Sequence, residues 1–207
     1  MTFLNQIKKY KNRTAVIDRN QVYTYSELIK ESKKITQDIK SRSLVFLLSS
    51  NNVETILYYI GLINKKAVVV ILNQNINSNN LKNLLIKYKP NYLILDKNYH
   101  LKNNYKILKI EKNYKILVRK KIFEHKIFKD LGILLSTSGT TGNPKFVRLS
   151  YQNYFDNSES IIKSIKLNQS DSVVTTLPIS YTYGLSIINT FLISGAKIIL
   201  NKSSILE

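Results

Sequence analysis

Two short runs of the sequence contain only apolar residues, LVFLL at 44–48 and AVVVIL at 67–72. Each has the length of a strand, and a strand without polar residues is typical of the centre of a parallel sheet, where both faces are buried. Two parallel neighbours need a crossover connection, and the segment that opens at Asn51 and Glu54 has the pattern of a helix. The order strand, helix, strand therefore predicts an α/β fold.

The same alternation continues along the chain. Further strands are expected at 14–18, 21–24, 92–95, 133–135, 172–176 and 196–200. Further helices are expected after Thr24, whose spacing to Glu27 is that of a capping box, at 81–88, from Ser150 onward, and up to about residue 193. We therefore predict an α/β protein with mainly parallel sheets flanked by helices and joined by right-handed crossovers.

The pattern weakens between Lys97 and Asp130, where Lys-rich segments carry only short apolar clusters. We predict three parts from this change: a first α/β lobe over 1–96, edge strands or a linker over 97–130, and the start of a second α/β lobe over 131–207. No helix follows the apolar strand at 196–200, so we expect the second sheet to be incomplete.

The net charge of +19, from 32 Lys and Arg against 13 Asp and Glu, would suit a polyanionic partner. The basic residues are scattered, however, and the chain is rich in Lys, Asn, Ile and Tyr together, as an AT-rich coding sequence would make it. No nucleic-acid-binding motif accompanies the charge. We therefore expect no specific binding of nucleic acid.

Cysteine is absent and the two histidines are His100 and His125, which excludes a disulfide framework and a Cys or His metal cluster. No metal site is expected. No apolar run approaches the roughly 18 residues that a membrane span needs, and the start MTFLNQIKKYKNR has no signal-peptide core. The expected location is the cytoplasm.

The most informative motif is STSGTTGNPK, at residues 136–145. Glycines allow positive φ angles and let backbone N–H groups approach an anion, hydroxyls donate to phosphate oxygens, and Lys145 adds a positive charge. The motif is not a Walker A loop, because Pro144 precedes the lysine and Phe146 stands where a metal-binding hydroxyl is needed. A flexible surface turn is the alternative, but an apolar strand leads into this segment and Pro144 restricts its exit.

STSGTTGNPK closely resembles the phosphate-binding signature of the adenylate-forming superfamily, which includes acyl-CoA synthetases, peptide-synthetase adenylation domains and luciferases. Ser150 and Asn153 match the pattern that follows this signature, whereas Phe146 and Tyr151 depart from it. Further similarities occur in the correct order: VYTYSEL at 22–28, GLINKKAVVVILN at 61–73, and an aromatic substrate-side motif held by Pro178, Tyr181 and Gly184. The resemblance implies an incomplete large amino-terminal domain of the adenylate-forming fold.

The resemblance also implies a reaction. A carboxylic acid and Mg²⁺-bound ATP form an acyl-adenylate and pyrophosphate, and a thiol such as CoA or a carrier protein's phosphopantetheine then takes the acyl group. The residues implied to hold the β and γ phosphates are Thr137, Ser138, Gly139, Thr140, Thr141, Gly142 and Lys145. Tyr181 and Gly184 would border the substrate pocket. A solvated lysine and a core aromatic residue are the alternative roles of Lys145 and Tyr181.

No residue of this sequence corresponds to the family's adenine segment, ribose-binding Asp, magnesium-associated acid or carboxy-terminal Lys. The catalytic residues are therefore unassigned, and we expect an amino-terminal part that is inactive alone, with a possible second chain supplying the other half. The alternatives are a phosphate-binding or nucleotide-binding module without catalysis, half of a split enzyme, and, least favoured, a basic nucleic-acid-binding protein. The sequence does not specify which acid is used.

Overall fold

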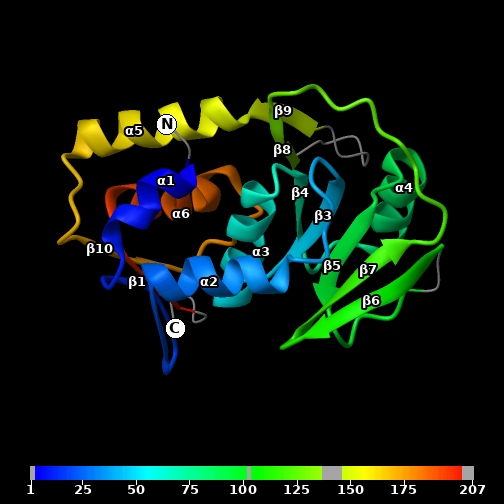
Figure 1. Cartoon of the computed structure of the whole chain (residues 1–207), viewed down its shortest axis with the longest axis horizontal. Helices are drawn as coiled ribbons and strands as arrows, with labels where there is room; N and C mark the ends of the chain where they lie inside the picture. Colours follow the sequence, from blue (N-terminus) through cyan, green and yellow to red (C-terminus); the bar gives the residue numbers. More distant parts are fainter. Residues whose placement is uncertain (1–2, 102–103, 137–145, 202–207) are drawn as a thin grey trace.

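The computed structural model describes residues 3–101, 104–136 and 146–201, which form helices and two β-sheets (Figure 1). The helices are α1 (Phe3–Ile7), α2 (Tyr25–Ile35), α3 (Val53–Asn64), α4 (Ser78–Tyr88), α5 (Tyr151–Ile165) and α6 (Thr182–Ser194), with a 3₁₀ turn at Lys8–Tyr10. The strands are β1 (Thr14–Asp18), β2 (Gln21–Thr24), β3 (Leu44–Ser49), β4 (Val68–Asn73), β5 (Tyr92–Asp96), β6 (Tyr105–Glu111), β7 (Tyr114–Arg119), β8 (Leu131–Ser136), β9 (Phe146–Ser150), β10 (Ser172–Thr175) and β11 (Lys197–Leu200).

The larger sheet has seven strands in the order β6-β7-β5-β3-β4-β8-β9. Its four central strands, β5, β3, β4 and β8, are mutually parallel, and the pairs at both ends are antiparallel. Every residue of β3 is buried, as its apolar sequence requires. The predicted α/β fold with parallel strands is therefore confirmed, while strand β9 was not predicted.

The smaller sheet joins the two ends of the described chain. Its order is β10-β11-β1-β2, and β1 pairs in parallel with β11 through Val16 and Ile198. In the larger sheet, β8 likewise pairs with β4, which lies far earlier in the sequence. Strand pairing thus crosses the proposed boundaries at 97 and 130, and the division into three parts stays a prediction.

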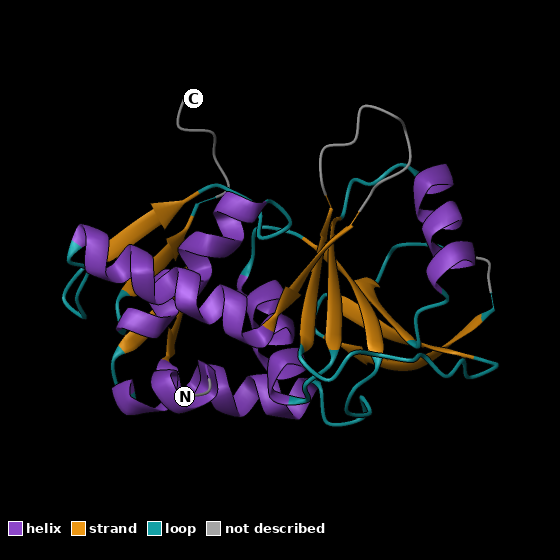
Figure 2. Cartoon of the chain, turned by 90° about the horizontal axis from the view of Figure 1, so that it is seen from above, coloured by secondary structure: helices purple, strands orange, loops and turns teal. Residues whose placement is uncertain are grey.

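Helix α3 is buried along nearly its whole length, and helices separate the strands of the two sheets (Figure 2). Its N-cap is Asn52, whose Oδ1 accepts a hydrogen bond from Thr55 N at 2.9 Å. The start predicted at Asn51 is therefore wrong by one residue. The Asn51 side chain instead donates to Thr175 O and Asn201 O at the carboxyl ends of β10 and β11.

Alternate side chains of the central strands enter two different cores. Val45 and Leu47 of β3 pack in the larger core, toward α3, α2 and the smaller sheet. Phe46 and Leu48 point to the opposite face, where Leu81, Leu84 and Leu85 of α4 cover the sheet. This two-sided burial explains why the central strands have no polar positions.

Helix α2 begins with the predicted capping box. Thr24 Oγ1 accepts a hydrogen bond from Glu27 N at 3.2 Å, and Glu27 Oε2 accepts one from Thr24 N at 2.8 Å. Both hydrogen bonds satisfy N–H groups that a helix start leaves unpaired. Of the helices in the described ranges, none has the length and apolar character of a membrane span.

Candidate functional site

The carboxyl ends of the four parallel strands meet at one edge of the larger sheet. Ser49, Asn73, Asp96 and Ser136 are the last residues of β3, β4, β5 and β8, and all four are polar. In open α/β sheets, ligands bind in crevices outside the carboxyl ends of the strands. The residues Leu48, Gln74, Asn75, Asp96, Asn98 and Tyr99 line an open hollow at this edge.

Strands β8 and β9 frame the segment singled out by its glycines and hydroxyls. They pair antiparallel, and the last residue of β8, Ser136, is opposite the first residue of β9, Phe146. Thr137, Ser138, Gly139, Thr140, Thr141, Gly142 and Lys145 lie outside the described residues. The two described residues that flank this segment in the sequence, Ser136 and Phe146, lie at the carboxyl edge of the parallel sheet.

The two residues that depart from the family pattern both have packing roles. The Phe146 ring contacts the Tyr88 ring of α4 edge to face, with 5.1 Å between centroids, so it ties β9 to the helix that covers the sheet. The Tyr151 hydroxyl donates to Ala67 O at 3.0 Å and accepts from Arg42 Nη1 at 3.4 Å. Burial raises the pKa of Tyr151 to about 12, so the phenol stays neutral at ordinary pH.

Ser150 and Asn153, which match the family pattern, form the capping box of α5. Asn153 N donates to Ser150 Oγ at 3.0 Å, and Ser150 N donates to Asn153 Oδ1 at 2.9 Å. This reciprocal pair satisfies two N–H groups at the helix start. Ser150 and Asn153 therefore determine, in this chain, how the helix that follows β9 begins.

Tyr181 and Gly184 lie where the chain turns into α6. Tyr181 is the N-cap residue and its side chain is 59% exposed, so it is not a core aromatic residue. Gly184 is buried, and a Cβ there would lie 2.3 Å from Pro178 O. Only glycine allows this close approach, which presses the Pro178 turn against the first turn of α6.

A hollow of about 430 Å³ opens between β8, β9, α5 and α6. It is lined by Leu135, Leu149, Asn153, Tyr154, Asn157, Thr182, Leu185, Ser186 and Asn189. The lining combines apolar walls with neutral amides and hydroxyls and includes no charged side chain. Tyr181 and Gly184 do not line it, although their neighbours Thr182 and Leu185 do.

The polar residues of α6 escaped the sequence analysis, although a signal was present. Ser186, Asn189 and Thr190 interrupt an otherwise apolar helix, and buried polar groups require partners. Asn189 has one, since its Oδ1 accepts from Tyr59 OH at 2.8 Å. Thr190 Oγ1 is buried without a partner in the described structure.

Ionisable groups contribute little to this hollow. Tyr154, at its wall, has a pKa well above 10 because burial disfavours the phenolate. Among the residues that the structure describes, no three His, Cys, Asp or Glu side chains are grouped so as to hold a metal ion. The hollow therefore offers neutral hydrogen-bonding groups and apolar surface to a ligand.

Comparison with known proteins identifies relatives along nearly the whole chain. The family model described as "AMP-binding enzyme" matches residues 3–206. A 2-succinylbenzoate–CoA ligase of Geobacillus sp. (strain WCH70) is 26% identical over 196 residues, covering 88% of this chain and 39% of the ligase. Gramicidin S synthase 2 of Brevibacillus brevis is 23% identical over 212 residues, covering 96% of this chain and 5% of the synthase. The chain therefore spans about two fifths, or less, of these relatives.

Solved structures share the fold. Apo MatB from Rhodopseudomonas palustris superposes with a TM-score of 0.78 at 16% identity, covering 98% of this chain and 45% of MatB. The O-succinylbenzoate CoA synthetase MenE from Bacillus subtilis, in complex with ATP and magnesium ion, gives 0.75 at 18% identity, covering 99% of this chain and 58% of MenE. These likenesses establish the architecture of the described residues.

Proposed function

We propose that this chain, which belongs to the AMP-binding enzyme family, is part of an ATP-dependent ligase that activates a carboxylic acid as an acyl-adenylate. One observation carries the proposal. Ser136 and Phe146, which flank the glycine and hydroxyl segment 137–145 in the sequence, pair at the carboxyl edge of the parallel sheet, and Leu135, next to Ser136, lines the hollow between α5 and α6. The strand end that leads into the donor-rich segment therefore borders a neutral hollow, as a reaction between a polyphosphate and an organic acid requires.

The proposed reaction needs positioning and charge neutralisation more than it needs an acid or base. A carboxylate oxygen attacks the α-phosphorus of ATP, the bond from that phosphorus to the β-phosphate bridging oxygen breaks, and pyrophosphate leaves with Mg²⁺. Thr137, Ser138, Gly139, Thr140, Thr141 and Gly142 would supply N–H and O–H donors to the β and γ phosphates. Lys145 would offset part of the negative charge, and donors fixed before the reaction stabilise its transition state.

The hollow between α5 and α6 supports an acid-binding role for this side of the site. Thr182 begins α6, a helix of 13 residues, and the partial positive charge of a helix start favours a carboxylate. The uncharged lining of the hollow can accommodate the rest of the acid without desolvating an ion. Tyr181 and Gly184 would border its entrance. A thiol, either CoA or a carrier protein's phosphopantetheine, is the proposed acyl acceptor, in keeping with the CoA ligase and peptide synthetase relatives.

The phosphate role can be tested on the chain itself with tripolyphosphate as the probe, because tripolyphosphate lacks the nucleoside. We expect ATP and tripolyphosphate to compete for one site and adenosine not to compete. Lys145→Ala should weaken tripolyphosphate binding about tenfold, the size of one charge-assisted contact. The matched control is Lys82→Ala, on the exposed face of α4. Equal weakening by both variants would reduce the binding to diffuse charge and overturn the proposal.

In this proposal, catalysis requires more than this chain. No residue of the chain is assigned to bind adenine, to bind ribose or to promote adenylyl transfer. We expect the purified chain to show no carboxylate-dependent exchange between ATP and pyrophosphate. The exchange should appear when a second chain that supplies those groups is added. Clear exchange by the 207-residue chain alone would contradict this part of the proposal.

A further inference from the structure

The segment 120–130, with the sequence KKIFEHKIFKD, connects β7 to β8 without regular secondary structure. It follows the rim of the molecule beyond β7 and α4 (Figure 1). It lies at the amino edge of the larger sheet, since it shares a hollow with the residues that precede β3 and β5. All of its residues are exposed except His125 and Ile127, which are half-buried.

This segment is held in place at several points. Asn91 Nδ2 donates to Phe123 O at 2.8 Å, and Asn91 Oδ1 accepts from Leu44 N at 2.9 Å, so one side chain links the segment to β3. Arg42 Nη2 donates to Phe128 O at 2.6 Å. Ile127 packs against the core beneath α4. The backbone is therefore fixed, and the outward direction of its other side chains is a feature of the fold.

Three large apolar side chains of the segment face solvent. Phe128 is 73% exposed, Ile122 64% and Phe123 42%. Single exposed apolar residues are ordinary, but three within seven residues of a fixed segment form a surface that water solvates poorly. Such a surface is typical of a binding site for an apolar partner.

Cations surround these apolar side chains. The segment and its immediate neighbours hold eight Lys and Arg side chains against two carboxylates, Glu124 and Asp130; the cations are Lys40, Arg42, Lys89, Arg119, Lys120, Lys121, Lys126 and Lys129. Within the described ranges, the ion pair found is Lys109 with Glu111, which belongs to β6. In the part of the chain that the structure describes, no ion pair therefore ties a cation of this surface to a carboxylate.

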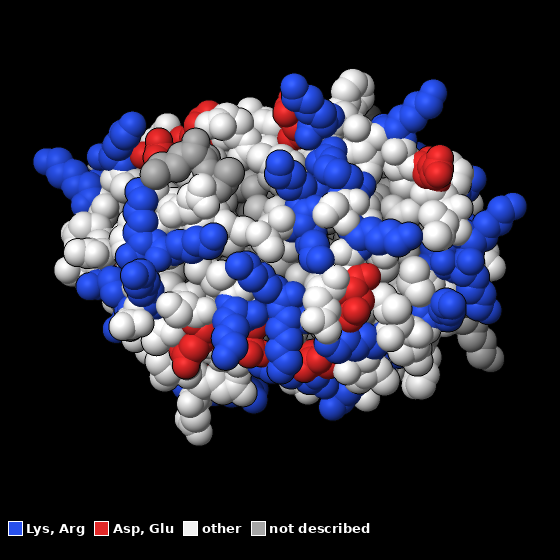
Figure 3. Space-filling model, in the orientation of Figure 1, with Lys and Arg blue, Asp and Glu red and all other residues white. Residues whose placement is uncertain are grey.

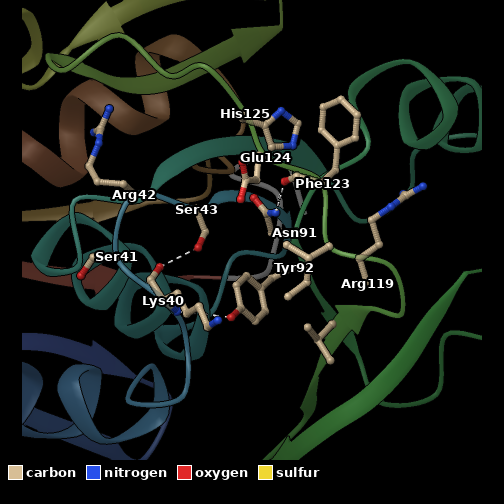
Figure 4. A pocket seen from close by; sticks show the side chains of 12 residues that line it. Lys40, Ser41, Arg42, Ser43, Asn91, Tyr92, Arg119, Phe123, Glu124 and His125 are labelled. Carbon is tan, nitrogen blue, oxygen red and sulfur yellow. Dashed lines mark hydrogen bonds between the residues drawn. The ribbon is translucent and has the colours of Figure 1, made fainter.

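Charge alone does not distinguish this surface, because Lys and Arg are spread over the whole visible face of the molecule (Figure 3). This surface is distinguished by having cations next to exposed apolar side chains. The hollow of about 400 Å³ under the segment does not resemble a pocket for one small anion. The side chains of Arg42 and Arg119 point away from its centre on opposite sides (Figure 4). Their guanidinium groups are already engaged, Arg42 by backbone carbonyls and Arg119 by Tyr105 OH at 3.3 Å.

We propose that segment 120–130 docks this protein peripherally on an anionic phospholipid bilayer. Ile122, Phe123 and Phe128 enter the interfacial region, and the surrounding lysines lie among the lipid phosphates. Polybasic surfaces bind anionic leaflets, and inserted aromatic and aliphatic side chains add an apolar contribution that salt does not screen. The surface lies at the edge of the sheet opposite to the proposed ligase site, so docking leaves that site open to solvent.

The first test is co-sedimentation of the full chain with vesicles. We expect at least about tenfold stronger binding to phosphatidylcholine vesicles that contain about 30% phosphatidylglycerol than to phosphatidylcholine alone. Raising the salt from about 50 to about 500 mM should weaken the binding without abolishing it, because the apolar contribution persists. Equal binding to both vesicles, or binding to double-stranded DNA with none to vesicles, would overturn the proposal.

Paired variants locate the surface. Ile122→Ser with Phe128→Ser should lower vesicle binding about tenfold, whereas Ile165→Ser, at a position 59% exposed at the end of α5, should not. Lys120→Glu with Lys126→Glu should lower it further than Lys30→Glu with Lys33→Glu on α2, although the net charge changes equally. Circular dichroism verifies that each variant is folded. Equal losses from the surface variants and their controls would show that binding is diffuse and would overturn the assignment.

Discussion

The carboxyl and amino edges of the larger sheet differ in the residues that accompany their lysines. At the carboxyl edge, β8 leads in the sequence to one lysine, Lys145, among glycines and hydroxyls, and Leu135 of β8 lines a hollow of neutral groups. At the amino edge, many cations accompany exposed Ile and Phe side chains and a backbone that is fixed by Asn91 and Arg42. The first arrangement suits a small, highly charged ligand, whereas the second suits an extended, charged and apolar surface.

The comparison shows that the charge of this chain carries no functional meaning until the neighbours of each cation are known. A net charge of +19 would assign the same partner to both edges. Backbone N–H groups and hydroxyls form directional hydrogen bonds, so they select a polyphosphate. Flexible exposed lysines act as non-directional charges and do not. Substitutions at one edge should therefore change the properties of that edge and leave the other edge unaffected.

The largest effect is expected at the carboxyl edge, from Gly184→Ala. The added Cβ would lie 2.3 Å from Pro178 O, so either the turn or the first turn of α6 must shift. We expect the free energy of unfolding to fall by roughly 3 kcal/mol, the upper part of the range for overpacking. Urea denaturation measures this. Tyr183→Ala, one residue earlier and 70% exposed, should have almost no effect.

Vesicle binding by the folded fraction of Gly184→Ala should match that of the unchanged chain. A parallel loss of vesicle binding would show that the two edges are coupled, and the comparison between them would fail. A neutral result for stability would show that the Pro178 turn does not press on α6 in solution.

A smaller effect is expected at the amino edge, from Arg42→Ala. The guanidinium donates to Lys66 O, Leu131 O and Phe128 O at 3.1, 3.1 and 2.6 Å, and the substitution leaves these carbonyls without that donor. We expect a loss of roughly 2 kcal/mol in unfolding free energy, as for hydrogen bonds from a charged group. Thermal or urea unfolding measures the loss, and Lys40→Ala, nearby and exposed, is the matched control.

Arg42→Ala should leave tripolyphosphate affinity within about a factor of two, because the residue lies at the opposite edge of the sheet from Ser136 and Phe146, which flank segment 137–145. A tenfold loss of that affinity would contradict the separation of the two edges. Arg42 has a left-handed backbone with φ of +56°, so Arg42→Gly, which relieves that conformation, should lose less stability than Arg42→Ala.

The centre of the fold could be predicted from the sequence because burial on both faces leaves no ambiguity in a strand such as LVFLL. The capping box at Thr24 was an equally local signal, and the helix start predicted at Ser150 is confirmed. Strand β9 was missed because it is a five-residue edge strand with exposed Val147, and such a strand shows no apolar run. The pairing of β1 with β11 depends on contacts across most of the chain, which no short pattern encodes.

The sequence can propose a phosphate-binding half of the candidate site because that half is one contiguous segment, and it stays a prediction. The hollow beside it combines side chains from β8, β9, α5 and α6. Asn189 contacts Tyr59, 130 residues away in the sequence, so its surroundings exist only after folding. The polar interruptions in α6 were the available signal, but they did not indicate which elements would face them.

The smallest effect is expected from Tyr151→Phe, and its pH dependence tests the packing where β8, β9 and the amino edge meet. The hydroxyl donates to Ala67 O at 3.0 Å, so its removal should cost about 1 kcal/mol at neutral pH. Burial raises the pKa of Tyr151 to about 12 in the folded chain, whereas an unfolded tyrosine titrates near its ordinary value of 10.0. The stability that the neutral phenol contributes is therefore complete below pH 10 and is lost as the pH rises toward 12.

Urea unfolding at a series of pH values should show that the difference in unfolding free energy between the unchanged chain and Tyr151→Phe, the gap, shrinks over that window. Tyr183→Phe, at an exposed position, should show no gap at any pH. A gap that stays constant from neutral pH to pH 12 would mean that the Tyr151 hydroxyl is solvated, and that Arg42 and Ala67 do not enclose it.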